Sequence, residues 1–446
     1  MGPPLLILAV AFLVILQFTI PKRYAFVPIL VACFHLGDME VLPQLTPVRI
    51  IILCGLARIT FSGTLTLKPQ SALDKTFYVF SVVALLVSMA PRLDIPSPLN
   101  QNLGLILNVH GTYLYGRNLL NGEDIIQRFA KALVIISLPL ALFVTLEQRS
   151  GRNYYKPLGA RSEYSMARLD KNRALGPFQH AILSGTAGAV VIPFGLLLWR
   201  RNKKLSLLGM ASGGAIVIAS ASSGPVAASI ATGACICVWP FRRKLTLIQR
   251  VGLAAAIVAH FVSSRGIWYL MARIDLVGGS TGYHRARLID SAIGDLHRWW
   301  FVGTDFTRTW MFSGVSWSPR HTDITNYYIQ FGVTGGLGLM LSFIAALFLA
   351  YKYCGERIRA TNFEASETNF SIWCVGAALT ANTISFFSIA YFDQSFVNVF
   401  MIVALAPAIA AIPIKTVDKA VRGPSSPNPT VTSTDHQPNQ ATATFQ

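Results

Sequence analysis

Charged residues are scarce in this chain. Of its 446 residues, 13% are Asp, Glu, Lys or Arg, whereas 53% are hydrophobic. A soluble protein carries about a quarter charged residues, so the composition argues against a soluble domain. Apolar runs of roughly 15–20 residues recur along the whole chain, which is the length that crosses the ~30 Å hydrocarbon core of a bilayer. The sequence therefore predicts an all-α, polytopic integral membrane protein.

Acidic residues are missing from the middle of the chain. No Asp or Glu occurs between Asp170 and Asp275. Ion-coupled transporters keep ionisable residues at membrane depth, so this gap argues against that class. The predicted outer loops, 148–180 and 264–323, also contain no Asp-x-Asp pair. We therefore expect no metal site and no cofactor.

The six cysteines lie in or beside apolar runs, at positions 33, 54, 235, 237, 354 and 374. Free Cys packs as a small hydrophobic side chain. The spacing predicts neither a disulfide framework nor a zinc site.

The apolar runs predict about 12–13 transmembrane helices. They lie near residues 3–20, 24–37, 47–62, 76–90, 99–117, 129–147, 181–199, 205–221, 225–240, 247–263, 324–350, 369–391 and 395–413. The chain thus divides into N-terminal transmembrane helices (1–147), a first periplasmic loop (148–180), central transmembrane helices (181–263), a large periplasmic loop with short helices (264–323), C-terminal transmembrane helices (324–413) and a disordered cytoplasmic tail (414–446). The pairs Gly185/Gly188 and Gly209/Gly213 predict close packing between helices.

Lys and Arg indicate the orientation, because short cytoplasmic loops accumulate them. In this count the basic short links, such as Arg200–Lys204 and Lys352–Arg359, occur at every second connection between helices and therefore lie on one side of the membrane. We place them in the cytoplasm, so that both long loops face the outside.

The two outer loops are rich in arginine. They hold 14 basic residues, of which 12 are Arg and only Lys156 and Lys171 are Lys. Arg favours planar, two-pronged binding of phosphate or carboxylate. One interpretation is a basic loop resting on anionic lipid headgroups. The other is a bound polyphosphate ligand, which explains the preference for Arg better.

Three polar motifs stand out against the apolar background. KNRALGPFQHAILSG surrounds Arg173, and YHRARLIDSA contains Arg285 and Arg287. HTDITNYYIQFGVTGG places His321 and Asp323 directly before an apolar helix.

In their order and predicted topology these motifs resemble the O-antigen ligase and O-antigen polymerase superfamily of bacterial membrane glycosyltransferases. The resemblance covers roughly residues 110–350. It rests on Arg173, Gly176 and Phe178, on Arg285 and Arg287, and on Asp323, Asn326, Tyr327, Tyr328, Gly332 and Gly335.

The resemblance implies a location and a reaction. Members lie in the bacterial inner membrane and transfer a glycan from an undecaprenyl-diphosphate carrier to an acceptor hydroxyl at the periplasmic face, without a metal. Arg173, Arg285 and Arg287 would then hold the diphosphate, and His321 or Asp323 would take the proton of the acceptor. Further candidates for substrate binding are Asn326, Tyr327, Arg161 and Trp300.

Several alternatives stay open at this point. The base is His321 or Asp323, and the Trp side chains of the large loop either stack on sugars or anchor it at the interface. The reaction is ligation or polymerisation. Other classes are a translocator of the lipid-linked saccharide and a non-catalytic partner of other polysaccharide-assembly proteins. Nucleic acid is not an expected ligand.

The orientation can be tested by cysteine labelling. In a Cys-free background, Ser162→Cys should react with a membrane-impermeant thiol reagent in intact spheroplasts, whereas Asn202→Cys should not. The opposite pattern would place both long loops in the cytoplasm.

Overall fold

A computed structural model describes residues 3–90, 98–168, 170–263, 265–273, 281–311 and 319–413. Met1–Ile412 is one compact unit, and only Pro413 is described of the second unit, Pro413–Gln446. The predicted disordered tail 414–446 therefore lies outside the described residues.

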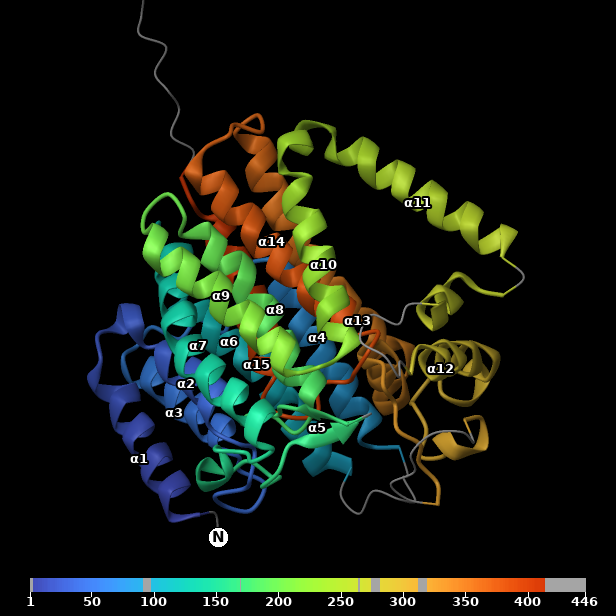
Figure 1. Cartoon of the computed structure of the whole chain (residues 1–446), viewed down its shortest axis with the longest axis horizontal. Coiled ribbons are helices and arrows are strands. Elements are labelled where there is room, and N and C mark those ends of the chain that lie inside the picture. Colours follow the sequence, from blue (N-terminus) through green and yellow to red (C-terminus); the bar gives the residue numbers. More distant parts are fainter. Residues whose placement is uncertain are drawn as a thin grey trace, which may run out of the picture. The chain divides into compact units, whose positions relative to one another are not determined.

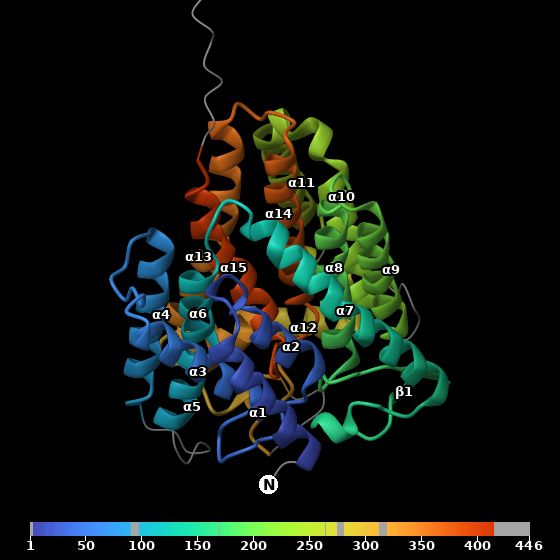
Figure 2. The same cartoon turned by 90° about the vertical axis from the view of Figure 1, so that its left-hand side faces the viewer.

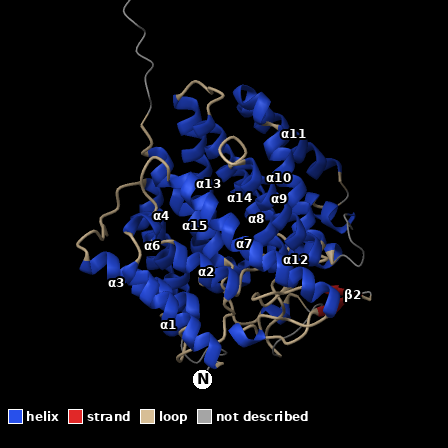
Figure 3. Ribbon diagram, turned by 60° about the vertical axis from the view of Figure 1, so that its left-hand side comes forward, coloured by secondary structure: helices blue, strands red, loops and turns tan. Residues whose placement is uncertain are grey.

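The chain is mostly helical and carries one small antiparallel sheet (Figure 3). The helices before the sheet are α1 Pro4–Thr19, α2 Val27–His35, α3 Pro47–Phe61, α4 Ala72–Val87, α5 Pro98–Ile106, α6 Thr112–Leu119 and α7 Ile125–Ser150, with a π-helical turn, Leu107–Gly111, joining α5 to α6. The sheet pairs β1 Met166–Arg168 with β2 Lys171–Arg173. The helices after it are α8 Ala181–Leu197, α9 Lys203–Ala219, α10 Ser223–Cys237, α11 Leu245–Val262, α12 Gly282–Gly294, α13 Tyr327–Ala360, α14 Glu367–Ser385 and α15 Phe396–Ala410.

Every predicted apolar helix overlaps a helix of the structure. Three helices of the described chain are long and apolar enough to cross a membrane, namely Ile125–Ser150, Trp239–Val262 and Tyr327–Ala360. Four shorter helices, α1, α8, α10 and α15, are also apolar. The sheet, which the all-α prediction did not include, lies in the predicted first outer loop.

Local sequence signals set several helix starts. Ser71 and Asp74 form a capping box before α4, in which the side chain of each accepts a hydrogen bond from the backbone N–H of the other. The side chains of Asn202 and Ser366 accept backbone N–H groups before α9 and α14. These contacts satisfy N–H groups that have no partner inside the helix.

Helix α8 lies at the centre of the second half of the chain. It packs against α7, α9, α10 and α14, and nearly all of its residues are buried. A Cβ atom on Gly188 would lie 2.6 Å from the carbonyl oxygen of Gly213, and a Cβ atom on Gly213 would lie 2.7 Å from that of Gly188. The predicted close packing at these glycines is therefore confirmed for α8 against α9.

Large apolar side chains are exposed on the outward helix faces. Helix α1 buries Leu6, Val10 and Leu13 at helical spacing, whereas Leu8 and Phe12 are 67% and 62% exposed. Helix α11 has no buried residue and runs away from the neighbouring helices (Figure 1). Soluble proteins rarely expose such extended apolar surface, so these faces are compatible with a membrane environment.

Helix α13 is interrupted near its N-terminal end. Gly335 and Gly336 have non-helical backbone angles, and Gly336 has φ +72°. The preceding loop supplies the missing partners, because the N–H of Leu337 donates to the carbonyl of Trp300 over 2.7 Å and that of Thr304 donates to the carbonyl of Val333 over 2.9 Å. A break in an apolar helix is tolerated where neighbouring groups satisfy the backbone in this way.

Several loops and helix ends lie together at one end of the helix bundle. Figure 2 shows β1, α5 and the N-terminal end of α1 at this end. The loops between α2 and α3, between α7 and α8, and between α14 and α15 meet there through hydrogen bonds from Gly37 to Leu158 and from Gln179 to Asp393. The predicted alternation of loops puts all three on the same side of the membrane.

The break in α13 can be tested with a matched pair of glycines. Gly336→Ala should lower the stability of the purified protein by at least ~1–2 kcal/mol, because a left-handed backbone is costly for any residue with a Cβ. The Cβ would also lie 2.1 Å from the carbonyl oxygen of Phe301. Gly376→Ala in α14 meets nothing within 4 Å and should be neutral or stabilising. Thermal unfolding in detergent measures both, and equal melting temperatures would contradict this account of the break.

Candidate functional site

A cavity of about 1110 Å³ lies where the polar loops meet the helix ends. Its walls come from six stretches of the chain, each placed on the same side by the predicted alternation of loops. The polar and charged lining residues are Arg49, Gln101, Asn102, Asn108, Arg161, Arg168, Arg173, Gln179, His180, Thr281, His284, Arg285, Thr304, Asp305, Thr307, His321, Thr322, Asp323, Thr325, Tyr327, Gln330, Thr334, Ser388 and Tyr391. The cavity therefore collects residues from all three sequence motifs.

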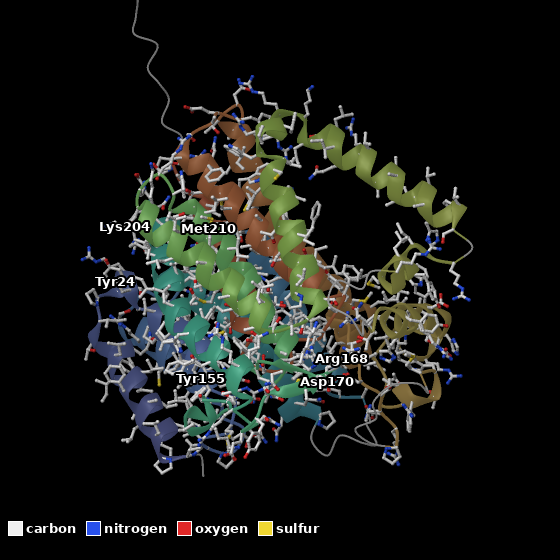
Figure 4. The ribbon with its side chains drawn as sticks, viewed as in Figure 1. Tyr24, Tyr155, Arg168, Asp170, Lys204 and Met210 are labelled. Atoms are coloured by element: carbon white, nitrogen blue, oxygen red, sulfur yellow. The ribbon has the colours of Figure 1, made fainter. Side chains whose placement is uncertain are left out.

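The β-hairpin brings two arginines to the cavity. Its register pairs Met166 with Arg173 and Arg168 with Lys171. Since side chains alternate across a strand, Arg168 and Arg173 share one face of the hairpin, and both line the cavity. Asn172 lies on the other face and donates to the carbonyl of Gln148 over 3.1 Å. Figure 4 marks Arg168 at the end of β1, close to Asp170 in the turn.

Arg173 is buried, with 6% of its surface exposed. Its Nη2 donates to the hydroxyl of Ser222 over 2.7 Å, and its Nε has no hydrogen-bond partner. Burial lowers the pKa of the Arg173 guanidinium, and the charge of Arg168 lowers it further. A buried guanidinium with an unused N–H is costly unless a ligand completes its hydrogen bonds.

Helix α12 adds a third arginine to this group. Burial lowers the pKa of Arg285 to about 10, with further contributions from Arg168 and Arg173. The Nε of Arg285 has no hydrogen-bond partner either. Among the described residues, no carboxylate forms an ion pair with any of these three side chains. We call Arg168, Arg173 and Arg285 the arginine triad.

Arg287 does not reach the cavity. It is exposed and absent from the lining, although it lies only two residues after Arg285. Residues two apart on a helix point to different faces. The structure thus separates two side chains that the sequence prediction assigned to one diphosphate, and the hairpin supplies Arg168 instead.

The turn between the hairpin and α8 is fixed by a carboxylate. Glu147, near the end of α7, accepts hydrogen bonds from the N–H groups of Leu175 and Gly176 over 2.7 and 2.9 Å. Gly176 has φ +61°, a conformation that glycine adopts readily. The side-chain amide of Asn153 donates to the Gly176 carbonyl over 2.8 Å. These bonds set where β2 ends and where α8 begins.

His180 caps α8 and lines the cavity. Its Nδ1 accepts the N–H of Ile182 over 3.0 Å. Burial lowers the pKa of His180 to about 4, and the charges of Arg173, Arg285 and Arg168 act in the same direction. The imidazole is therefore neutral at pH 7. Because Nδ1 is an acceptor, the ring proton is on Nε2, and His180 is a hydrogen-bond donor at that atom.

A polar network supports the cavity wall near Arg161. Arg161 binds Asp38 through Nε and Nη2, both over 3.2 Å, and the side-chain amide of Gln179 also donates to Asp38. The backbone N–H of Gln179 donates to Asp393 over 2.9 Å. Burial raises the pKa of Asp393 to about 6, although hydrogen bonds from Ser395 and Gln179 oppose the shift. Arg161 therefore lines the cavity already paired with a carboxylate.

His321 and Asp323 line the cavity just before α13, and both are partly buried. The segment is attached to the preceding loop, since Thr322 N donates to the Thr307 hydroxyl and Arg308 N donates to the Arg320 carbonyl, each over 2.8 Å. Burial lowers the pKa of the neighbouring His284, while the charge of Asp323 opposes this shift. Both candidates for the base thus share one cavity with the arginine triad.

The remaining predicted site residues divide into two groups. Tyr327 lines the cavity, whereas Asn326 and Trp300 do not. Asn326 instead caps α13, where its side chain accepts the N–H of Ile329 over 3.1 Å. Trp300 is 51% exposed, and its carbonyl completes the break in α13.

Sequence analysis did not select Arg49, Arg168 or His180. Arg49 had a usable signal, because a charged residue inside a predicted membrane helix is usually functional. Arg168 and His180 gave no such signal, since only the hairpin register and the helix cap bring them to the cavity. Among the described residues, no group of three or more His, Cys, Asp or Glu is arranged to hold a metal ion.

The lowered pKa of His180 predicts a dependence of stability on pH. The unfolded chain binds a proton at His180 below about pH 6.5, whereas the folded chain does so only near pH 4, so acidification between these values destabilises the fold. The loss from pH 7 to pH 5 is at most about 2 kcal/mol. His180→Asn keeps a capping acceptor without titrating. Its melting temperature should fall less over this range than that of the wild type, and equal falls would contradict the shift.

Comparison of the sequence with known protein families gives no match, and comparison with curated proteins gives none either.

Proposed function

We propose that the protein is a membrane glycosyltransferase that takes a glycan from an undecaprenyl-diphosphate carrier and transfers it to an acceptor hydroxyl. One observation carries this proposal. The arginine triad, without a carboxylate partner among the described residues, lines the same cavity as His321 and Asp323. Anion binding and proton removal, the two tasks of such a transfer, would then occur within one space.

The triad suits the leaving group of this reaction. When the bond between the sugar carbon and the diphosphate oxygen breaks, negative charge develops on that oxygen. Preorganised guanidinium groups in a partly buried site stabilise such charge strongly. The unused Nε atoms of Arg173 and Arg285 are available as donors. Neutral His180 adds a donor without adding repulsion to the triad.

The acceptor hydroxyl must lose its proton as the new glycosidic bond forms. His321 or Asp323 would accept that proton as general base. The backbone segment that carries both residues is held before α13 by the hydrogen bonds from Thr322 N to Thr307 and from Arg308 N to the Arg320 carbonyl. The acceptor decides between ligation, in which another molecule is glycosylated, and polymerisation, in which a second carrier-linked glycan is extended.

The apolar helices support a membrane location for this chemistry. Three helices are long enough to cross a bilayer, and outward faces such as that of α1 expose Leu and Phe. A polyprenyl carrier would remain in the lipid while its diphosphate enters the cavity. We further propose that the protein is a multi-pass protein of a bacterial inner membrane and that the cavity opens to the periplasm, in line with the charge asymmetry of the short loops.

Translocation of the same lipid-linked saccharide is the second candidate. The break at Gly335 and Gly336 favours it, since interrupted membrane helices place their ends at the substrate sites of transporters. A translocator would need the triad for anion binding, but it would need no base.

The triad can be tested with neighbouring variants of one helix. Arg285→Lys should lower glycan transfer at least tenfold, because Lys keeps the charge but lacks the planar fork. Arg287→Lys is the matched control and should keep near-normal transfer, since Arg287 is exposed outside the cavity. Transfer is measured in membranes of a null strain and normalised to protein level. Equal activity of the two variants would argue against a diphosphate site at the triad.

The base can be tested separately. His321→Ala or Asp323→Ala should slow transfer by roughly 10²–10⁴-fold while binding of the carrier stays nearly unchanged. We expect this behaviour from only one of the two variants. If both variants retain transfer and Arg285→Lys loses it, the translocator becomes the better candidate.

A further inference from the structure

A fourth arginine lines the cavity without belonging to the triad. Arg49 is in the first turn of α3 and is partly buried. No carboxylate among the described residues forms an ion pair with it, in contrast to Arg161, which binds Asp38. Arg49 is not part of the proposed diphosphate site, which therefore does not explain its positive charge in the cavity wall.

Two groups hold the Arg49 guanidinium in place. Its Nε donates to the side-chain oxygen of Asn108 over 2.9 Å, and its Nη1 donates to the carbonyl of Gln44 over 2.7 Å. The described residues give Nη2 no hydrogen-bond partner. This nitrogen lies above Gly104, where a Cβ would come within 2.9 Å of it. The guanidinium is thus oriented, with donors left over for a ligand.

Both holding groups come from unusual backbone. Asn108 lies in the π-helical turn Leu107–Gly111, and such turns often occur at functional sites. Gln44 has φ +63°, which is unfavourable for a residue other than glycine. Strained backbone of this kind persists where it serves a purpose. Two segments with irregular backbone therefore both hold the side chain of Arg49.

Three amide side chains line the cavity from the helical segment that also holds Arg49 through Asn108. Gln101, Asn102 and Asn108 line the cavity from α5 and the π-helical turn, with Leu105 between them at helical spacing. Amides both donate and accept hydrogen bonds, which suits sugar hydroxyls. A guanidinium among amides suits a saccharide that also carries an acidic group.

Arg49 reaches the cavity from other elements than the triad. It is carried by α3 and held by Asn108 and by the loop before α3, whereas the triad comes from the hairpin and from α12. The cavity, of about 1110 Å³, thus receives guanidinium groups from two separate sets of elements.

We propose that Arg49, held by Asn108, forms a second oxyanion subsite of the cavity, and that this subsite binds the acidic group of the acceptor saccharide. The oxyanion is a carboxylate, as in a uronic acid, or a phosphate. The assignment to the acceptor rests on the proposed transfer reaction, because the triad then holds the diphosphate of the donor.

Binding of radiolabelled inorganic diphosphate tests this subsite. The full-length protein is purified and placed in nanodiscs of neutral phosphatidylcholine. The wild type should show two classes of site. Arg285→Ala should remove one class, and Arg49→Ala should remove the other while leaving the affinity of the first within twofold. Asn108→Asp should act like Arg49→Ala, because a carboxylate beside the guanidinium neutralises it.

The control is Arg58→Ala on the same helix. Arg58 also donates to backbone carbonyls, those of Gln17 and Ile20, but it does not line the cavity. This variant should keep both classes. If Arg58→Ala also loses a class of site, the loss in Arg49→Ala is an effect on folding. Asn108→Asp is then the decisive variant. Retention of both classes of site in Asn108→Asp would overturn the proposal.

Further outcomes separate this proposal from the proposed function. A single class of site that Arg285→Ala removes and Arg49→Ala leaves intact would overturn the second subsite and leave the donor site standing. A single class of site that both variants weaken would place Arg49 in the donor site, and this result would also overturn the second subsite. No binding at all would count against both proposals.

Competition identifies the acid at the second class of site. Displacement of the label by glucuronate indicates a carboxylate, and displacement by inorganic phosphate indicates a phosphate. Either result supports the subsite, whereas displacement by neither overturns it.

Discussion

The two hydrogen bonds that Glu147 accepts from Leu175 and Gly176 connect α7 with the turn before α8. This contact determines where the hairpin stands, because β2 runs directly into that turn. It also determines where α8 begins, and so where the His180 cap lies. This turn holds the arginine face of the hairpin at the cavity together with the bonds from Asn172 to Gln148 and from Arg173 to Ser222. Loss of the carboxylate would remove both hydrogen bonds between α7 and this turn.

Burial of the arginine triad and repulsion between its members both make the site costly. The charge of Arg168 lowers the pKa of Arg173, and the charges of Arg168 and Arg173 lower that of Arg285. Folding concentrates this charge, and a bound polyanion would relieve it. His180, which burial keeps neutral, adds no further charge to the triad. An anion is therefore the ligand that the site favours most.

Apolar and irregular segments have different roles in this chain. The apolar helices form the scaffold, whereas their breaks connect them to neighbouring loops and helices. The interruption at Gly335 and Gly336 joins α13 to the loop that carries Trp300, and the π-helical turn brings Asn108 to Arg49. The break in α13 is stabilised by backbone hydrogen bonds from another element, as irregular backbone among apolar helices requires.

The sequence by itself determined the helices and the motifs. Apolar runs long enough for a bilayer predicted where the helices lie, because burial of apolar length is a local property of the chain. The same reasoning selected Arg173, Arg285, His321 and Asp323, since polar residues in an apolar chain are conspicuous. Periodicity alone could have separated Arg285 from Arg287, although the prediction grouped them.

Only the tertiary structure decided which of these side chains share a space. Arg168 reaches the cavity through the register of a short hairpin, and Arg161 is already paired with Asp38 from a distant loop. Arg49 gains its orientation from a turn in another helix. These outcomes depend on contacts between segments far apart in the chain, and local sequence patterns carry no information about such contacts.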